Sequence, residues 1–109
     1  MRIENVPFQT IDWASVPATS HPGETGAASW QTVEVGNLRV RLVTYSPGYL
    51  ADHWCERGHV IHVLEGALTT ELRDGRMFET PAGGSYLVAT GDGAHRSRTQ
   101  AGAVLFIVD

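Results

Sequence analysis

Turn-forming residues cut the chain after residue 30 into short segments at regular intervals. The clearest turn is Asp74-Gly75, which lies between the runs LTTELR and RMFET and predicts a β-hairpin. No helical period appears in this part of the sequence. Short strands at such regular spacing are typical of an all-β sandwich or barrel. We expect strands over residues 30–35, 38–46, 51–55, 60–64, 67–73, 77–80, 85–89, 94–99 and 103–108.

The first 29 residues differ from the rest because they are irregular and punctuated by Pro and Gly. They nevertheless carry Phe8, Ile11 and Trp13, large apolar side chains that need a surface to pack against. The chain has 109 residues, which is the length of one domain. We therefore expect an N-terminal arm over residues 1–29, lying against the outside or the mouth of a barrel formed by residues 30–109.

Composition excludes several classes of function. The net charge is −4, which argues against nucleic acid as a partner because a phosphate-binding surface needs a basic patch. All eight basic residues are Arg, so the chain has no lysine for a Schiff base or a P-loop. No apolar run approaches the ~20 residues of a membrane span. The single cysteine, Cys55, permits no intrachain disulfide, and we expect a cytoplasmic protein without a signal peptide.

Histidines carry the strongest chemical signal in this sequence. Alternate residues of a strand share a face, so His53 and Cys55 are expected to point the same way. The turn at residues 56–58 then returns the chain, which allows His59 to join them. His95 lies on a later strand that a barrel can place beside this turn. Counted along the strand from His59, residues 61 and 63 face inward. His62 lies between them and is therefore expected at the surface.

The stretch H53-W-C55-x3-H59-x6-G66 resembles the first motif of the cupin family, which runs H-x-H, three or four residues, E, six residues, G. His53 matches the first histidine, Cys55 falls on the second, and His59 falls on the glutamate. The second motif is degenerate, because only its Gly and its His survive. Its positions are occupied here by Gly84, Ser85, Thr90, Asp92, His95 and Thr99.

The run Asp52-His53-Trp54-Cys55 further resembles the small single-domain bacterial cupins described by a DHCW motif. The resemblance covers nearly the whole chain. It implies a double-stranded β-helix, or jelly-roll, with one divalent metal held by His53, His59 and His95. It implies no particular reaction.

The ligand set departs from the usual three His and one Glu, because Cys55 stands in place of a histidine and no carboxylate is present. Soft, nitrogen-rich ligation suits Zn, Ni, Fe or Cu better than Mg or Ca. If Cys55 is a fourth ligand, the site is a closed tetrahedron. If it is not, one coordination position is open to water or substrate. A reactive thiol is the third alternative for Cys55.

Two functions remain open on this evidence. The first is a metal-dependent enzyme acting on a small metabolite, with Glu24 and Asp52 as the nearest acid–base groups. The second is a non-catalytic module that binds a small molecule or senses a metal. Val60 and Leu64 flank His62 on the outer face, and apolar residues there predict a homodimer. Tyr49, Tyr86, Trp54, Arg96 and Arg98 are expected to serve packing or the solvated surface.

Overall fold

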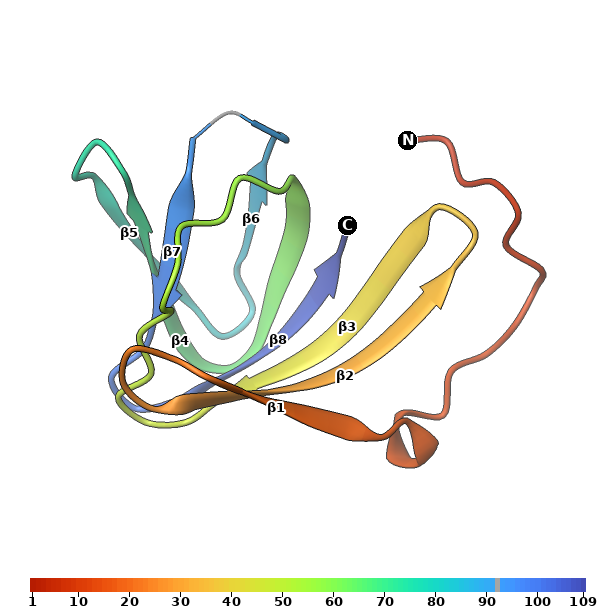
Figure 1. Cartoon of the computed structure of the whole chain (residues 1–109), viewed down its shortest axis with the longest axis horizontal. Coiled ribbons are helices and arrows are strands. Elements are labelled where there is room, and N and C mark those ends of the chain that lie inside the picture. Colours follow the sequence, from red (N-terminus) through yellow and green to blue (C-terminus); the bar gives the residue numbers. More distant parts are fainter. Residues whose placement is uncertain (92) are drawn as a thin grey trace.

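The computed structural model describes residues 1–91 and 93–109, and these form a curved all-β structure (Figure 1). One of the residues matched to the second cupin motif, Asp92, lies outside the described residues. The regular elements of the described chain are one short 3-10 helix, η1, and eight strands. They are η1 (Trp13–Ser15), β1 (Ala18–Pro22), β2 (Ala27–Val35), β3 (Leu38–Tyr45), β4 (His59–Leu72), β5 (Met77–Pro81), β6 (Ser85–Val88), β7 (His95–Arg98) and β8 (Ala103–Val108).

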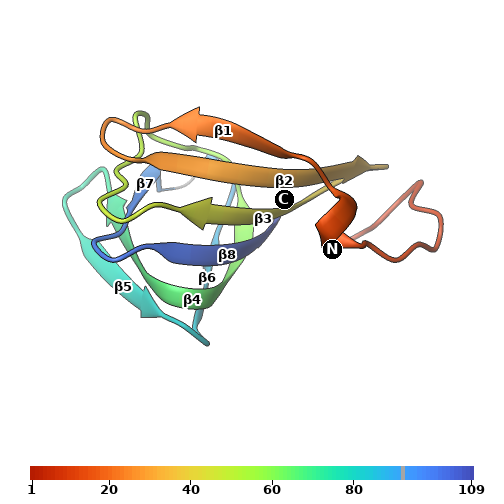
Figure 2. The ribbon, with the colours of Figure 1, turned by 90° about the horizontal axis from the view of Figure 1, so that it is seen from below.

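The strands run in the order β1-β2-β3-β8-β4-β5, and β6 and β7 also pair with β4. Every one of these pairings is antiparallel. Seen from below in Figure 2, β1, β2, β3 and β8 lie side by side. Together with the first part of β4 and with β6 they form one wall, and β5, β7 and the last part of β4 form the other. The all-β jelly-roll expected from the sequence is confirmed.

Strand β4 joins the two walls because it changes partners along its length. Its first residues pair with β6 and β8, and its last residues pair with β5 and β7. The register shifts between Val63 and Glu65, which marks a β-bulge. Gly66 follows at φ 74°, a conformation that glycine adopts without strain. The bulge therefore bends β4 where the sequence suggested a break between two strands.

The core lies between the two walls and follows the alternation of the strands. Val43, Val63, Leu68 and Leu105 are completely buried. In β8 the buried residues are Ala103, Leu105 and Ile107, while their neighbours are only partly covered. This period of two is what a sheet with one face on the core requires.

Two segments differ from the expected strands. Residues 51–58 form a loop instead of a strand at 51–55. An isolated bridge between Cys55 and His95 and a backbone hydrogen bond from Ala51 to Ser97 tie this loop to β7. Nearer the N-terminus, where no strand was expected, residues 18–22 form β1, which pairs with the first half of β2. Within the first 29 residues the chain thus adds an edge strand to the sheet. Phe8, expected to pack, is 98% exposed.

The segment before η1 runs along the far end of the β2–β3 hairpin (Figure 1). Asn37 holds it there, because its side chain accepts from the backbone of Glu4 and donates to the backbone carbonyl of Arg2. No helix of the described residues is long and apolar enough to cross a membrane.

Candidate metal centre

A pocket of about 250 Å3 opens on the inner side of the sheet, beside the loop over residues 51–58. Strands β2, β3, β4, β6, β7 and β8 contribute to its wall. The four residues singled out as metal ligands all line it: His53, Cys55, His59 and His95. The structure therefore places all four predicted ligands around one pocket.

Three of these residues come together closely enough to share one ion. Cys55, His59 and His95 each offer a ligand atom, and these atoms lie within 4.8 Å of one another. Sγ of Cys55 is 3.4 Å from Nε2 of His59, and the rings of His59 and His95 meet edge-on at 5.2 Å between centroids. Backbone bonds between Cys55 and His95, at 2.7 and 3.0 Å, fix the loop to the start of β7. The group is thus held by the fold.

The hydrogen bonds of the two buried histidines determine which ring nitrogen is free. Nδ1 of His59 contacts Oδ2 of Asp109 at 2.8 Å, and Nδ1 of His95 contacts the carbonyl oxygen of Gly93 at 3.1 Å. A carbonyl or carboxylate oxygen only accepts, so each Nδ1 carries the proton. The lone pair of each neutral ring is then on Nε2, which is the arrangement found around bound metals.

His53 lies on the rim of the same pocket but outside the close group. Its side chain is 69% exposed, and its Nδ1 contacts Oδ1 of Asp52 at 2.7 Å. The hydrogen bond to His53 lowers the pKa of Asp52. The expected shared face of His53 and Cys55 depended on a strand at 51–55, and the loop removes that parity. The role of His53 as a ligand stays a prediction.

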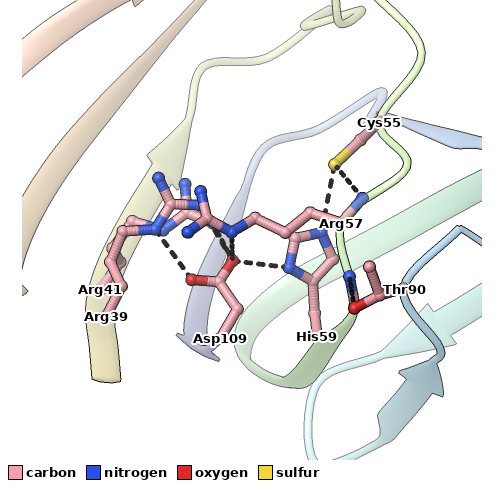
Figure 3. A network of polar contacts seen from close by, with 8 residues as sticks. Arg39, Arg41, Cys55, Arg57, His59, Thr90 and Asp109 are labelled. Carbon is pink, nitrogen blue, oxygen red and sulfur yellow. Dashed lines mark hydrogen bonds and ion pairs between the residues drawn. The ribbon is translucent and has the colours of Figure 1, made fainter. Parts of the chain in front are cut away.

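Asp109 is the centre of a charged network that sequence reasoning missed (Figure 3). Arg39 holds both of its carboxylate oxygens, at 2.8 and 2.9 Å. Arg41 donates to Oδ2 at 3.2 Å, and Nε of Arg57 lies 3.6 Å from the same oxygen. Figure 3 shows Asp109 between these guanidinium groups and the ring of His59. One side-chain carboxylate therefore faces three arginines and a histidine.

Burial and charge act in opposite directions on this network. Burial raises the pKa of Asp109, but the hydrogen bond from Arg39 and the charge of Arg41 outweigh it, and the pKa falls to about 2. Burial lowers the pKa of His59, and the contact with Asp109 offsets this only in part. His59 is consequently neutral near pH 7, as a metal ligand must be.

Tyrosines line the rest of the pocket. The rings of Tyr45 and Tyr49 stack at 4.2 Å, and burial raises the pKa of Tyr49 to about 12. Burial also raises the pKa of Tyr86. Among the described residues, the buried hydroxyl of Tyr86 has no hydrogen-bond partner. Burial raises the pKa of Tyr45 as well, so all three phenols are neutral near pH 7.

The remaining polar residues divide between pocket and surface. His62 bonds to Ser85 at 2.7 Å and does not line the pocket, and Arg98 is exposed, both as expected. Arg96, expected in the solvated surface, instead lines the pocket and is only 25% exposed. It lies 4.8 Å over the ring of Trp54 and pairs with Glu71 at 3.3 Å. These partners draw it off the surface.

Comparisons with known proteins identify the fold. No family model and no curated protein matches the sequence. Three solved structures illustrate the likeness. A sugar phosphate isomerase from a cupin superfamily, of Silicibacter pomeroyi, is 21% identical, with 92% of this chain and 74% of that chain covered and a TM-score of 0.71. The polyketide cyclase RemF of Streptomyces resistomycificus is 19% identical, with 94% and 78% covered and a TM-score of 0.74. The EutQ protein of Clostridium difficile is 13% identical, with 91% and 83% covered and a TM-score of 0.74. The chain has the cupin fold.

Proposed function

We propose that this cupin is a metal-dependent enzyme that acts on a small metabolite. The observation that carries the proposal is the group formed by Cys55, His59 and His95, whose ligand atoms lie within 4.8 Å of one another. His53, on the rim of the same pocket, is the proposed fourth ligand. The run Asp52-His53-Trp54-Cys55 supports membership in the DHCW-motif cupins.

The donor set fits one divalent transition metal. Two imidazoles present Nε2 because their Nδ1 atoms already donate to oxygen, and a thiol adjoins them. No carboxylate belongs to the group, so Zn, Ni, Fe or Cu suits it better than Mg or Ca. Such a metal supplies Lewis acidity and a lowered pKa for bound water. Among these metals we make no choice.

The protein's own groups prepare the pocket for catalysis. Asp109 keeps the proton of His59 on Nδ1, and the unpartnered hydroxyl of Tyr86 is a donor for an oxygen of the substrate. A volume of about 250 Å3 lies below the range of sites for drug-sized ligands, so the substrate is small. The cyclase and isomerase named above are enzymes of the same fold, which favours catalysis over a module that only binds or senses.

Metal retention tests the ligand set. We expect about one metal ion per chain in freshly purified protein, measured by elemental analysis. After dialysis against a moderate chelator, His95→Ala and Cys55→Ser retain far less metal than wild type. His53→Ala loses metal to a smaller extent, because its exposed side chain is less firmly held. His62→Ala, on the same strand as His59 but outside the pocket, is the matched control and retains the wild-type amount.

Two results would contradict the proposal. Equal retention in His95→Ala and His62→Ala removes the metal centre altogether. Wild-type retention in Cys55→Ser removes the thiol from the ligand set and leaves a coordination position open. Bound metal without turnover of any small oxygenated substrate favours the alternative of a sensing module.

A second candidate function uses the same residues without a metal. Cys55, His59 and Asp109 form two successive contacts. Sγ of Cys55 lies 3.4 Å from Nε2 of His59, and Nδ1 of His59 lies 2.8 Å from the carboxylate of Asp109. A thiol, a base and a group that orients the base are the parts of a nucleophilic site. Alkylation with iodoacetamide separates the two functions. A metal ligand is protected when metal is loaded, whereas a free nucleophile reacts at the same rate with and without metal.

The quaternary state and location complete the proposal. Val60 and Leu87 are cross-strand partners on β4 and β6, and they are 41% and 75% exposed. With Leu64, 46% exposed, they support a homodimer through this face. Cys55 is a free thiol, and it can serve as a metal ligand only while it stays reduced. This requirement favours a reducing, cytoplasmic setting.

A further inference from the structure

Three arginines of the pocket converge on the side-chain carboxylate of Asp109. Arg39 holds both oxygens of Asp109 and also faces Glu34 across the β2–β3 pair, so its charge is matched. Arg41 and Arg57 share Oδ2 of the same aspartate, at 3.2 and 3.6 Å. Arg41 and Arg57 thus have a single side-chain carboxylate oxygen between them. A guanidinium has five N–H donors, so both groups have donors left for a further anion.

Arg41 carries a second, independent sign of a missing partner. Its side chain is 6% exposed, and among the described residues its Nε has no hydrogen-bond acceptor. A buried donor without a partner is uncommon, because leaving it unsatisfied costs free energy. One face of the guanidinium is covered by Trp30, whose ring lies 4.5 Å from Cζ. The group is therefore fixed in place, charged and incompletely bonded at the wall of the pocket.

We propose that Arg41 and Arg57 form the binding site for the carboxylate of a small monoanionic organic acid. Planar guanidinium groups match carboxylates geometrically, and the negative charge of Asp109 beside both arginines favours a monoanion over a phosphate dianion. Arg57 is 54% exposed and reaches the pocket from the loop, so it meets the ligand from the solvent side. Oδ2 of Asp109 contacts both arginines and Nδ1 of His59, which places this acid site next to the metal ligands.

The inference deepens the proposed function, since it names the substrate class of the same pocket. It does not depend on the metal, because among the described residues the guanidinium groups of Arg41 and Arg57 make no hydrogen bond to Cys55 or His95. The contact of Arg57 with Sγ of Cys55 is made by its backbone amide. A ligand held at this site extends toward the Cys55–His59–His95 group. The about 250 Å3 of the pocket restricts that ligand to a short chain.

Calorimetric titration with lactate tests the site. We use protein stripped with chelator and protein reloaded with Zn2+, each titrated with lactate, with its neutral analogue lactamide, and with inorganic phosphate. Lactate binds both forms, lactamide binds neither, and phosphate binds more weakly than lactate. Added salt weakens the binding, because part of the attraction is between charges. The Nε–H resonance of Arg41 shifts on addition of lactate in 15N-labelled protein.

Variants locate the binding on these two arginines. Arg57→Gln changes an exposed side chain, so the fold is kept, and we expect lactate affinity to fall roughly five- to tenfold. Arg41→Gln is expected to lose at least as much lactate affinity as Arg57→Gln. Circular dichroism checks that this variant remains folded. Arg96→Gln is the matched control. Arg96 lines the same pocket but forms ion pairs with Glu71 and Glu24, at 3.3 and 3.7 Å. We therefore expect the lactate affinity of Arg96→Gln to stay within about twofold of wild type.

Several outcomes overturn the inference. Wild-type affinity in Arg57→Gln, or an equal loss in Arg96→Gln, removes the assigned arginines. Tighter binding of phosphate than of lactate changes the ligand class. Binding only after Zn2+ is loaded assigns the carboxylate to the metal. Lactate binding by wild-type protein that retains no metal after purification or reloading supports the acid site while rejecting the metal centre, so the two proposals fail separately.

Discussion

Nδ1 of His59 lies 2.8 Å from Oδ2 of Asp109, and both side chains are almost completely buried, at 6% and 2% exposure. A second pair, whose histidine lies on the rim of the same pocket, has nearly the same contact distance, since Nδ1 of His53 lies 2.7 Å from Oδ1 of Asp52. That pair is 69% and 59% exposed. The two His–Asp pairs thus share their contact geometry but differ in burial and in the three arginines that contact Asp109 alone, so Asp52 is the exposed comparison for Asp109.

Asp109→Asn is expected to weaken metal binding about 10- to 100-fold, which is the usual effect of losing the partner of a metal-bound histidine. The amide no longer guarantees an acceptor for Nδ1 of His59, and it leaves Arg39 and Arg41 without their carboxylate. Asp52→Asn, the exposed counterpart, is expected to change affinity much less. Competition with a chelating dye measures both variants. Equal losses would show that burial does not distinguish the two pairs.

Asp109 also predicts how stability depends on acidity. Its pKa is about 2 in the folded chain, below its ordinary value of 3.8. A carboxyl whose pKa is lowered by folding stabilises the protein above its unfolded pKa. The contribution, about 2 kcal/mol, is then lost as the pH falls from about 4 to about 2. Urea unfolding across this pH range measures the loss.

The control for acid stability is Asp74, whose pKa is also lowered but whose partner Arg76 lies with it at the surface. Asp74→Asn is expected to leave the acid limb of the stability curve nearly unchanged, because solvent screens an exposed pair. Asp109→Asn is expected to flatten that limb. If Asp74→Asn flattens it as well, the acid sensitivity does not arise from the buried network.

Much of the fold was predictable because alternation and turn residues are local signals. The hairpin at Asp74-Gly75 lies where the sequence predicted it, between β4 and β5. The inward position of His59 was predictable from its place in the first cupin motif. That of His95 was predictable from its place in the second motif together with strand alternation. The sequence predicts two strands, at residues 60–64 and 67–73, because Glu65-Gly66 resembles a turn. In the structure these two residues instead lie at a bulge inside the continuous strand β4.

The loop at 51–58 shows what alternation alone does not resolve. Residues Asp52 to Cys55 have no local feature that separates a strand from an extended loop. Trp54 turns to the guanidinium groups of Arg73 and Arg96, at 5.4 and 4.8 Å, and this contact depends on residues far along the chain. His53 is consequently left at the rim.

The network around Asp109 was missed for a similar reason. Arg39 and Asp109 are 70 residues apart, and their contact exists only because β3 pairs with the end of β8. One signal was nevertheless present in the sequence. Ala103, Leu105, Ile107 and Asp109 share a parity, so a carboxylate follows three inward residues on the same face. A charged residue continuing a buried face requires a partner, and in a chain without lysine the available partners are arginine and histidine.

The exposed apolar face on β4 and β6 predicts the assembly. Leu87→Arg places a charge on the proposed dimer face and is expected to convert a dimer into a monomer. Thr44→Arg, which adds the same charge at an exposed position of β3, is the control and is expected to leave the dimer intact. Sedimentation at micromolar concentration measures both. A wild-type monomer under these conditions would contradict the dimer.

Gly66 provides a test of the bulge that joins the two walls. Its φ is 74°, and a Cβ added there would overlap the carbonyl oxygen of Gly102. Gly75 has φ 97°, and within the described part of the chain nothing lies within 4 Å of an added Cβ. Both alanine variants suffer the left-handed strain of roughly 1 to 2 kcal/mol. Only Gly66→Ala must also move the backbone of the neighbouring turn.

We therefore expect Gly66→Ala to lower the free energy of unfolding by roughly 2 to 4 kcal/mol, clearly more than Gly75→Ala. Urea denaturation of the two variants measures the difference. Because the bulge sets the register of β4, and His59 begins that strand, metal retention is expected to fall in Gly66→Ala and to remain normal in Gly75→Ala. Equal destabilisation of both variants would mean that Gly102 gives way easily and that the bulge is not held by this close approach.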